Sequence, residues 1–303
     1  MTPTAIPFTH TSTDPRTSGV LTVTGRRNTP QTPAAAARVP LIIAIHGGTY
    51  TSGYFDIEGY SLLERAAALG VPVIALDRPG YAGSTPVEPG ESIILANAEA
   101  LTHVIGELWQ QHGDGHAGVF VIGHSIGGAV TTAIAAGQPT WPLLGIAVSG
   151  CLLQVPDGPR MAFDALPDIL MIDLPGPMKD SVMFGPAWTH ATTMPELSHS
   201  CDTSVPRAEL IDINNGWISR VRSVNAQVTV PVHARQGEFD ALWITDAGQA
   251  ADYAASFTSA PVVDGRLVLN AGHCVDFHHA GAALQLSQLA FALECSVAKQ
   301  DAT

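Results

Sequence analysis

Short runs of apolar residues recur along the chain and set its expected framework. Three clear examples cover residues 40–45, 71–76 and 143–149. Unbroken apolar runs of about four to eight residues are typical of strands that are buried on both faces of a parallel sheet. Residues 119–122 form another run of this kind, which ends abruptly at Gly123.

Segments with the apolar spacing of helices separate these runs. Residues 56–69 place apolar side chains on one helix face at Ile57, Tyr60, Leu63 and Ala67, and Gly70 follows as a stop signal. A longer stripe in residues 91–111 predicts a second helix, and the Ala-rich residues 129–137 predict a third. Because strands and helices alternate strictly, we predict an α/β protein with a mostly parallel sheet and helices on both faces.

The N-terminal part of the chain shows weaker patterns. Alternation at Ile6 and Phe8 predicts an edge strand, and residues 19–27 alternate more clearly as a second strand. Residues 29–38 are rich in Pro and Ala, so we expect a connecting loop there.

The alternation of strands and helices stops at about residue 151 and resumes later. Residues 151–226 are dense in Pro, Met and aromatic residues. The later pattern predicts a strand, a helix, a short strand and a closing helix at residues 228–234, 244–257, 266–269 and 280–297. Since no internal repeat and no linker between independent cores is found, we expect one core of residues 1–150 and 227–303. Residues 151–226 would be an insertion after the sixth strand.

Composition supplies a large core and limits the expected partners. The 303 residues are 46% hydrophobic and only 14% charged, and 14 basic against 27 acidic residues give a formal net charge of −13. Binding to nucleic acid or to an anionic membrane needs clustered Lys and Arg, so both partners are disfavoured. The sequence also lacks any stretch near the roughly 20 apolar residues that a membrane span requires.

The cysteines and the N-terminus indicate the compartment. Cys151, Cys201, Cys274 and Cys295 form no C-x-x-C pair, so neither a zinc ribbon nor a thioredoxin-like motif is indicated. Residues 1–7 lack the basic start and apolar run of a signal peptide. We therefore expect free thiols, no metal or other cofactor, and a cytoplasmic protein.

One segment combines a strand, a tight turn and a helix around a serine. The run at 119–122 leads into Gly123-His124-Ser125-Ile126-Gly127, and the Ala-rich helix follows at once. A G-x-S-x-G turn of this kind strains the backbone of the serine and lifts its hydroxyl clear of the sheet edge. The N-terminal amides of the helix stabilise negative charge at the same place. Ser125 is therefore predicted to be a nucleophile.

Two later loops carry the partners that a reactive serine needs, namely a base and an acid that orients the base. Loops after the strands of a parallel sheet converge at one edge. Asp240 follows the strand at 228–234, and His273 follows the strand at 266–269. These two residues are the candidates for acid and base. The nearby alternatives are Glu238 and Asp246 for the acid, and His278 and His279 for the base.

Taken in order, these motifs resemble those of the α/β-hydrolase superfamily. The matching segments are His46-Gly47-Gly48, Asp77-Arg78-Pro79-Gly80-Tyr81, the turn at Ser125, Asp240 after its glycine, and Gly272-His273. The resemblance covers about residues 19–297 apart from the insertion. It implies an α/β-hydrolase fold in which Ser125 is the nucleophile, His273 the general base and then acid, and Asp240 the group that orients the imidazole.

An oxyanion hole is also expected, because attack on a carbonyl builds negative charge that needs preorganised N–H donors. The backbone amide of Ile126, directly after the nucleophile, is one candidate. The resemblance implies that the second donor comes from the loop after the third strand. There the amide of Gly48 is favoured, and that of Thr49 is the alternative.

The inserted residues 151–226 resemble the cap of this superfamily, and apolar walls above a serine favour a largely hydrophobic substrate. The combined prediction is a cofactor-free serine hydrolase of the carboxylic ester type. It would cleave an ester, lactone or thioester through an acyl-enzyme on Ser125.

Other functions share this scaffold. Epoxide hydrolases and dehalogenases use an Asp nucleophile where this chain has Ser125, and they are disfavoured for that reason. Carbon–carbon bond hydrolases, acyltransferases and cyclases keep the same three residues, and some relatives are non-catalytic ligand-binding proteins. These classes remain alternatives, and the sequence leaves open whether the chain forms a homo-oligomer.

Overall fold

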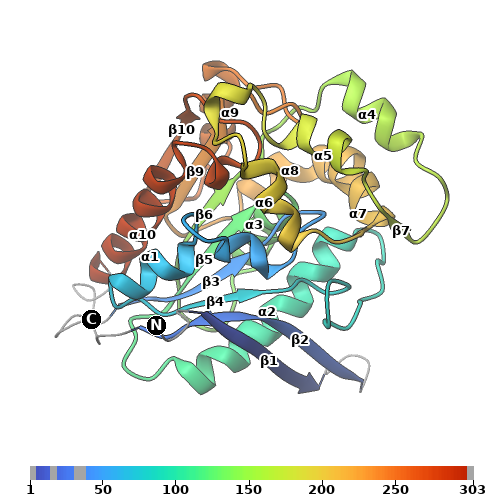
Figure 1. Cartoon of the computed structure of the whole chain (residues 1–303). Coiled ribbons are helices and arrows are strands. Elements are labelled where there is room, and N and C mark those ends of the chain that lie inside the picture. The colour runs from blue at the N-terminus through green and yellow to red at the C-terminus, as the bar shows by residue number, and fades with distance from the viewer. Residues whose placement is uncertain (1–4, 14–18, 31–38, 299–303) are drawn as a thin grey trace.

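The computed structural model of the chain describes residues 5–13, 19–30 and 39–298. These residues form an eight-stranded sheet in the order β1-β2-β4-β3-β5-β6-β9-β10, with helices on both sides (Figure 1). The strands are β1 (Ala5–Thr13), β2 (Val20–Asn28), β3 (Leu41–Ile45), β4 (Val73–Leu76), β5 (Val119–His124), β6 (Leu143–Ser149), β9 (Val232–Gly237) and β10 (Val263–Val268). The predicted loop at 29–38 lies largely outside the described residues.

The direction of the strands confirms the predicted fold class. β1 pairs with β2 and β2 with β4 in antiparallel fashion, whereas every later neighbour pair is parallel. All residues of β3, β4, β5 and β6 are buried. Their unbroken apolar sequences therefore reflect strands that helices cover on both faces.

Two hydrophobic cores lie on the two faces of the sheet. Ile43 and Ile45 of β3 belong to the core packed by α2 (Ile93–His112), α3 (Ile126–Ala136), α8 (Trp217–Asn225) and α9 (Ala247–Ala255). Ile42 and Ala44 belong to the core packed by α1 (Leu62–Ala68) and α10 (Gly281–Ala298). Successive residues of a strand point to opposite faces, so one apolar strand supplies both cores.

Short elements occupy the chain between β6 and β9. They are α4 (Asp157–Asp164), β7 (Met171–Ile172), α5 (Gly176–Met183), a 3₁₀ helix (Ala187–Thr189), α6 (Met194–Ser198), a second 3₁₀ helix (His199–Cys201), β8 (Val205–Pro206), α7 (Arg207–Ile211), a π turn (Asp212–Gly216) and α8. β7 and β8 pair with each other. α8 packs against α3, whereas side chains of α4, α5 and α7 line a cavity that also contains Ser125.

Several predicted boundaries are wrong, for local reasons. The helix expected at 56–69 begins only at Leu62, because residues 52–56 form a 3₁₀ helix and the Ser61 hydroxyl caps α1 by accepting from the N–H of Glu64. The strand expected at 228–234 begins at Val232, because Pro231 has no N–H to donate.

The two remaining differences also concern element ends. The helix expected at 244–257 is the shorter α9, which Asp246 caps by accepting from the N–H of Gln249. The strand expected at 266–269 is β10, which begins earlier at Val263 and pairs with β9 along its whole length. A further 3₁₀ helix (Val275–Phe277) precedes α10.

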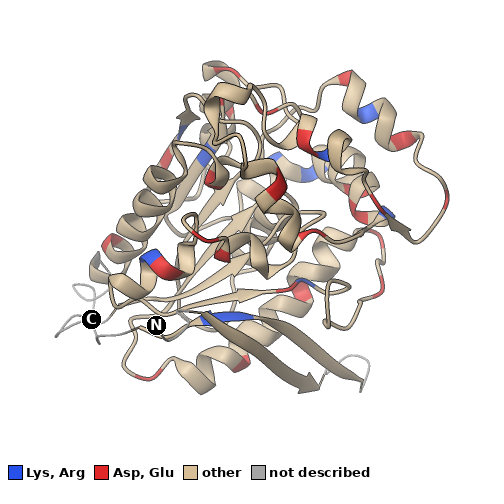
Figure 2. Cartoon of the chain, viewed as in Figure 1, with Lys and Arg blue, Asp and Glu red and all other residues tan. Residues whose placement is uncertain are grey.

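The described ranges contain no helix that is both long and apolar enough to cross a bilayer. Acidic positions are spread along the ribbon, with fewer basic positions among them (Figure 2). All four cysteines are buried free thiols.

A buried histidine in β9 determines part of the pH dependence of stability. His233 is 1% exposed, and its Nε2 lies 3.1 Å from Oγ of Ser287 in α10. Burial, and then the charge of Arg235, lowers the pKa of His233 to about 3, against about 6.5 in an unfolded chain. Between these two values the unfolded chain binds a proton that the folded chain does not. The folded state therefore loses stability as the pH falls through this window.

We predict that the stability of His233→Gln falls less steeply than that of the parent as the pH is lowered. One such group changes the free energy of unfolding by about 1.4 kcal/mol per pH unit below about pH 6. The variant should lack this contribution when its unfolding in urea is followed by circular dichroism at several pH values. His279→Gln, at an exposed position, is the control and should keep the parent slope. An unchanged slope in His233→Gln would show that the folded protein accepts the proton.

Candidate active site

The turn at Ser125 is as sharp as its sequence predicts. Ser125 lies between β5 and α3 with φ 54° and ψ −125°, a strained conformation for a residue with a side chain. A Cβ on Gly123 would lie 2.4 Å from the carbonyl oxygen of Gly127, and one on Gly127 would lie 2.3 Å from that of His46. Gly123 is therefore required for α3 to pack closely on the end of β5, and Gly127 for the turn to close against the end of β3.

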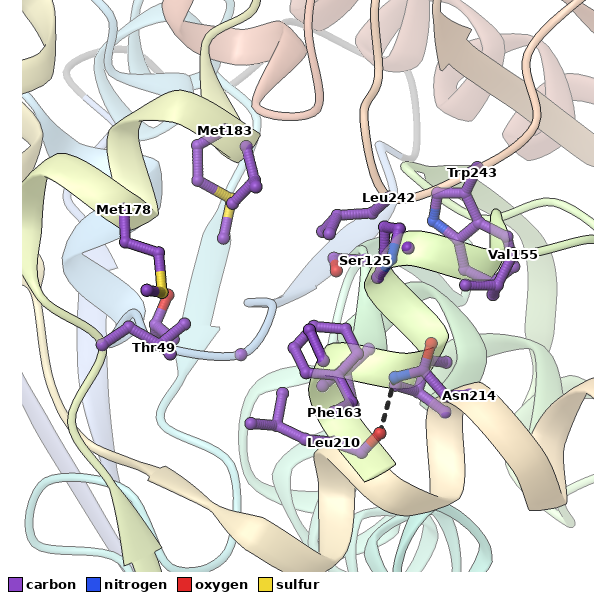
Figure 3. Close-up of a pocket in the computed structure, with 18 residues that line it drawn as sticks. Thr49, Ser125, Val155, Phe163, Met178, Met183, Leu210, Asn214, Leu242 and Trp243 are labelled. Atoms are coloured by element: carbon purple, nitrogen blue, oxygen red, sulfur yellow. Dashed lines mark hydrogen bonds between the residues drawn. The ribbon is translucent and has the colours of Figure 1, made fainter. Parts of the chain in front are cut away.

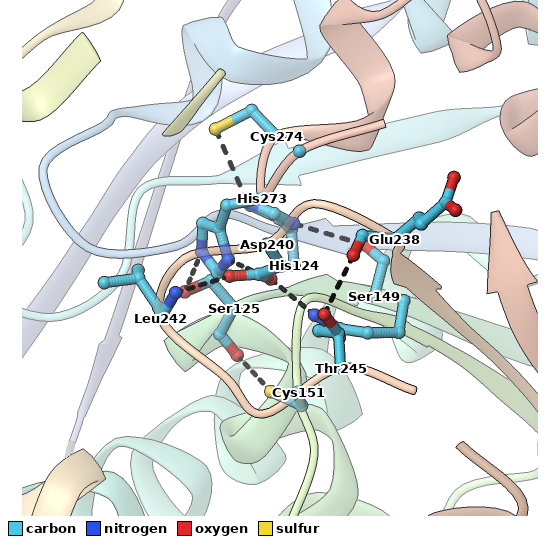
Figure 4. Close-up of polar contacts among 12 residues, drawn as sticks. His124, Ser125, Ser149, Cys151, Glu238, Asp240, Leu242, Thr245, His273 and Cys274 are labelled. Atoms are coloured by element: carbon cyan, nitrogen blue, oxygen red, sulfur yellow. Dashed lines mark hydrogen bonds and ion pairs between the residues drawn. The ribbon is translucent and has the colours of Figure 1, made fainter. Parts of the chain in front are cut away.

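Three side chains from distant parts of the chain meet at this turn (Figure 4). Nε2 of His273 lies 2.9 Å from Oγ of Ser125, and Nδ1 of His273 lies 2.6 Å from Oδ2 of Asp240. A carboxylate only accepts, so Nδ1 carries the proton and Nε2 is free to accept from the serine hydroxyl. His273 and Asp240 are buried, and Ser125 is partly buried. The structure thus brings together the nucleophile, base and acid expected from the sequence.

Asp240 is held by two further donors. The N–H of Leu242 donates to its Oδ1 at 2.8 Å, and Nε2 of Gln236 donates to Oδ2. These bonds fix the carboxylate that faces His273. Sequence reasoning missed Gln236, because the predicted strand ended at residue 234 whereas β9 runs on to Gly237.

The alternative residues serve other contacts. Glu238 accepts from the N–H of Asn270, and Asp246 caps α9. His278 bonds to backbone groups that include the carbonyl of Cys274, and His279 is exposed. Each of these side chains makes its contact away from Ser125.

His124, next to Ser125, packs between two aromatic rings of the site. Its ring stacks on Tyr54 with centroids 4.6 Å apart, and it lies 4.9 Å from the ring of His273. Burial, followed by the nearby His273, holds the pKa of His124 well below its usual value. A neutral imidazole therefore packs behind His273 and adds no charge to it.

The loop after β3 is held in one orientation by His46 and Arg78. The N–H of Arg78 donates to Nε2 of His46 at 3.0 Å, so Nδ1 of His46 carries the proton and donates to the carbonyl of Gly47 at 2.7 Å. Nη2 of Arg78 donates to the same carbonyl at 3.2 Å. Because a trans peptide is planar, fixing this carbonyl also fixes the N–H of Gly48, which points the opposite way.

The two expected oxyanion donors lie beside Ser125. A Cβ on Gly47 would lie 2.9 Å from Cβ of Ser125, and one on Gly48 would lie 3.1 Å from Cδ1 of Ile126. Within the described ranges, the N–H groups of Gly48 and Ile126 donate to no other group. Thr49, the alternative, has φ 64°, and its buried Oγ1 has no hydrogen-bond partner in the described structure.

An apolar cavity of about 280 Å³ opens beside these groups (Figure 3). Gly48, Thr49, Ser125 and Ile126 form its side next to the sheet. Most of the remaining lining is apolar and comes from the elements between β6 and β9, including Val155, Phe163, Met178, Met183 and Leu210. The expected hydrophobic surroundings of Ser125 are therefore present.

Comparison with known protein families shows which family the chain belongs to. The model of the alpha/beta hydrolase family matches residues 42–284, most of the chain. The chain belongs to this family. The superfamily resemblance deduced from the sequence motifs is thereby confirmed.

Individual relatives of this alpha/beta hydrolase are distant. A stretch of 128 residues, 42% of the chain, is 30% identical to mouse protein phosphatase methylesterase 1 and spans 30% of that protein. An esterase from Thermogutta terrifontis has a TM-score of 0.65 at 15% identity, covering 94% of this chain and 98% of its own. The N-acyl homoserine lactonase AidH has a TM-score of 0.61 at 20% identity, covering 96% and 98%. At these identities the solved structures show the shared fold.

A buried ion pair joins the loop after β4 of this alpha/beta hydrolase, which contains Arg78, to Glu209 in α7. Arg78 and Glu209 are both fully buried and make two hydrogen bonds of 2.6 and 2.8 Å. The hydroxyl of Tyr81 donates to the same carboxylate at 2.6 Å. Burial opposes the charge of Arg78, but the carboxylate of Glu209 more than offsets it, and the pKa of Arg78 is raised. Sequence reasoning missed Glu209, whose partner lies 131 residues away.

We predict that Gly127→Ala disrupts the turn, whereas Gly128→Ala is tolerated. The new methyl at 127 would meet two backbone carbonyls at 2.3 Å, while at 128 its nearest neighbour is Sγ of Cys151 at 3.1 Å. The first change should cost about 2–4 kcal/mol in urea unfolding. The second should stay within about 1 kcal/mol, because Ala also favours the helix. Equal losses in the two variants would contradict the close approach of Gly127 to β3.

We predict that Glu209→Gln costs about 3–5 kcal/mol of unfolding free energy, because it leaves the charge of Arg78 buried without its partner. The double variant Arg78→Met/Glu209→Leu should recover part of this loss. Arg160→Gln is the matched control, since its ion pair with Asp157 is solvent-exposed and should be worth less than about 1 kcal/mol. A loss in Glu209→Gln as small as in the control would show that water reaches the pair.

Proposed function

We propose that this chain is a serine hydrolase that cleaves an ester, lactone or thioester of a largely hydrophobic substrate. The observation that carries the proposal is the chain of short contacts from Ser125 through His273 to Asp240 beside an apolar cavity. A strained serine with a neutral, correctly oriented imidazole on its hydroxyl is the arrangement that nucleophilic catalysis needs.

The reaction follows from the positions of these atoms. Oγ of Ser125 attacks the substrate carbonyl while its proton passes to Nε2 of His273. The imidazolium then gives this proton to the departing alcohol, thiol or lactone oxygen, which leaves an acyl group on Ser125. A water molecule, deprotonated by His273, releases the acid and restores the serine. Asp240 stabilises the imidazolium through Nδ1 in both halves.

The N–H groups of Gly48 and Ile126 are proposed to stabilise the negative oxygen that forms in each half-reaction. Neither N–H donates to another of the described residues, and both lie at the side of the cavity that contains Ser125. The contacts of Arg78 and His46 with the Gly47 carbonyl fix the first donor before the substrate arrives. Such preorganisation is commonly worth about 10²–10³ in rate for one donor.

Residues 151–226 are proposed to act as the cap that selects the substrate. Their side chains form most of the cavity wall, although α8 packs on α3 of the core. A volume of about 280 Å³ lies near the lower end of ligand pockets, roughly 300–1,000 Å³. We therefore propose a compact substrate with a short or medium-length acyl group.

The relatives are consistent with this range of substrates. Similar structures include an N-acyl homoserine lactonase and a monoacylglycerol lipase, and mouse protein phosphatase methylesterase 1 is one of the relatives in sequence. A haloalkane dehalogenase is also similar in fold, but that chemistry needs a carboxylate nucleophile where this chain has Ser125. Carbon–carbon hydrolysis and acyl transfer would use the same residues and are separated by the test below.

We predict that Ser125→Ala abolishes hydrolysis of p-nitrophenyl butyrate and labelling by a fluorophosphonate. Asp240→Asn should lower kcat by about 10³–10⁴, because the imidazole loses its correct tautomer. Ser223→Ala, an exposed serine, is the control and should behave as the parent. Full activity in Ser125→Ala would exclude Ser125 as the nucleophile.

The same assay separates the alternatives. An ester hydrolase should show a butyryl adduct on Ser125 by intact mass and release free butyrate. Predominant butyryl transfer to an added amine would favour an acyltransferase. Absence of both labelling and turnover in the folded parent would favour a ligand-binding protein.

A further inference from the structure

Asn214 places a polar atom in the apolar cavity. The residue is 4% exposed and lines the cavity from the π turn that follows α7. Its Nδ2 donates to the backbone carbonyl of Leu210 at 2.7 Å. Because a carbonyl can only accept, this bond assigns the amide nitrogen to the side of α7 and leaves Oδ1 on the other side (Figure 3).

Oδ1 of Asn214 receives no hydrogen bond from any residue of the described ranges. Its surroundings in the cavity are mainly apolar side chains such as Phe163 and Leu210. Asn214 lines the cavity, so a ligand bound there can reach this oxygen. A hydrogen-bond donor on that ligand would supply the partner that the described residues do not provide.

The segment that leads to Asn214 is held at two points. Before it, Glu209 is clamped by Arg78 and Tyr81. Within the π turn, Oδ2 of Asp212 accepts from Oγ of Ser92 at 2.5 Å and from the N–H of Ile94 at 3.1 Å, at the start of α2. π turns are uncommon and often occur at functional sites. Asn214 therefore presents its oxygen from a rigid support, as a selective site requires.

We propose that Oδ1 of Asn214 is an acceptor subsite that selects a substrate carrying an N–H donor, such as a secondary amide, in an otherwise apolar acyl group. The inference rests on the proposed function, since the same cavity contains Ser125. An acceptor-only atom favours an amide N–H over a methylene and disfavours a carboxylate at that place. Sites built to pair with a polar group reject analogues that lack it.

The test compares ligands that differ only at this donor. We would use methyl esters of N-acetylglycine, N-acetyl-β-alanine and N-acetyl-γ-aminobutyrate, each paired with the ketone in which CH₂ replaces the amide N–H. Dissociation constants would be measured with Ser125→Ala by saturation-transfer NMR, so that binding is read without turnover. The three lengths place the donor at three distances from the ester. We expect one length at which the amide binds about 2- to 12-fold more tightly than its ketone, the range of one net hydrogen bond.

The variant Ser125→Ala/Asn214→Leu should lose this preference by weakening the amide alone. Ser125→Ala/Ile213→Leu is the matched control, because Ile213 lines the same cavity from the adjacent position, and it should keep the preference. Thermal unfolding of each variant separates a purely structural asparagine from a binding one. A structural role would lower the melting temperature and leave the amide-to-ketone ratio unchanged.

Failure of this inference and failure of the proposed function give different results. Equal binding of amide and ketone at all three lengths would overturn the subsite, because Oδ1 would then be satisfied by water alone. The parent would still hydrolyse p-nitrophenyl butyrate in that case. Conversely, an amide preference without any turnover in the parent would retain the subsite and overturn the hydrolase.

Discussion

The buried guanidinium of Arg78 is the interaction on which the arrangement of the site depends. It reaches the carbonyls of His46 and Gly47 on one side and the carboxylate of Glu209 on the other, and it lies 4.5 Å above the ring of Tyr81. A charge without water must have its acceptors in place. The β3 loop and α7 therefore cannot move apart without exposing or orphaning this charge.

This constraint ties two chemically different parts of the molecule to one another. The edge of the sheet supplies Ser125, His273 and the free N–H groups, all placed by the ends of strands. The elements between β6 and β9 supply most of the apolar wall. Since Glu209 belongs to the second part and Gly47 to the first, the pair sets the distance between wall and nucleophile. The shape of the cavity then depends on a single polar contact as much as on apolar packing.

The positions of the candidate catalytic residues were easier to predict from the sequence than those of the residues around the cavity. Ser125, Asp240 and His273 each follow a strand, and the ends of parallel strands converge whatever their exact boundaries. Asp240 therefore lies beside His273, as predicted, despite a four-residue error in the start of β9. Glu209 and Asn214 have no such signal. Glu209 pairs with a residue 131 positions away, and Asn214 lies in a π turn whose sequence resembles an ordinary helix, so only the folded chain shows their surroundings.

Some departures from ideal structure lie in the wall of the cavity beside Ser125. Ser125 and Thr49, which both line it, have positive φ values of 54° and 64°, and among the described residues Oγ1 of Thr49 is buried without a hydrogen-bond partner. Strain and unpaired polar groups each cost stability, so they persist only where the surrounding structure enforces them. In a neighbouring polar pocket, by contrast, Lys179 and Asp202 form an ion pair with each other. The strained residues Ser125 and Thr49 therefore lie in the wall of the cavity that we propose as the binding site.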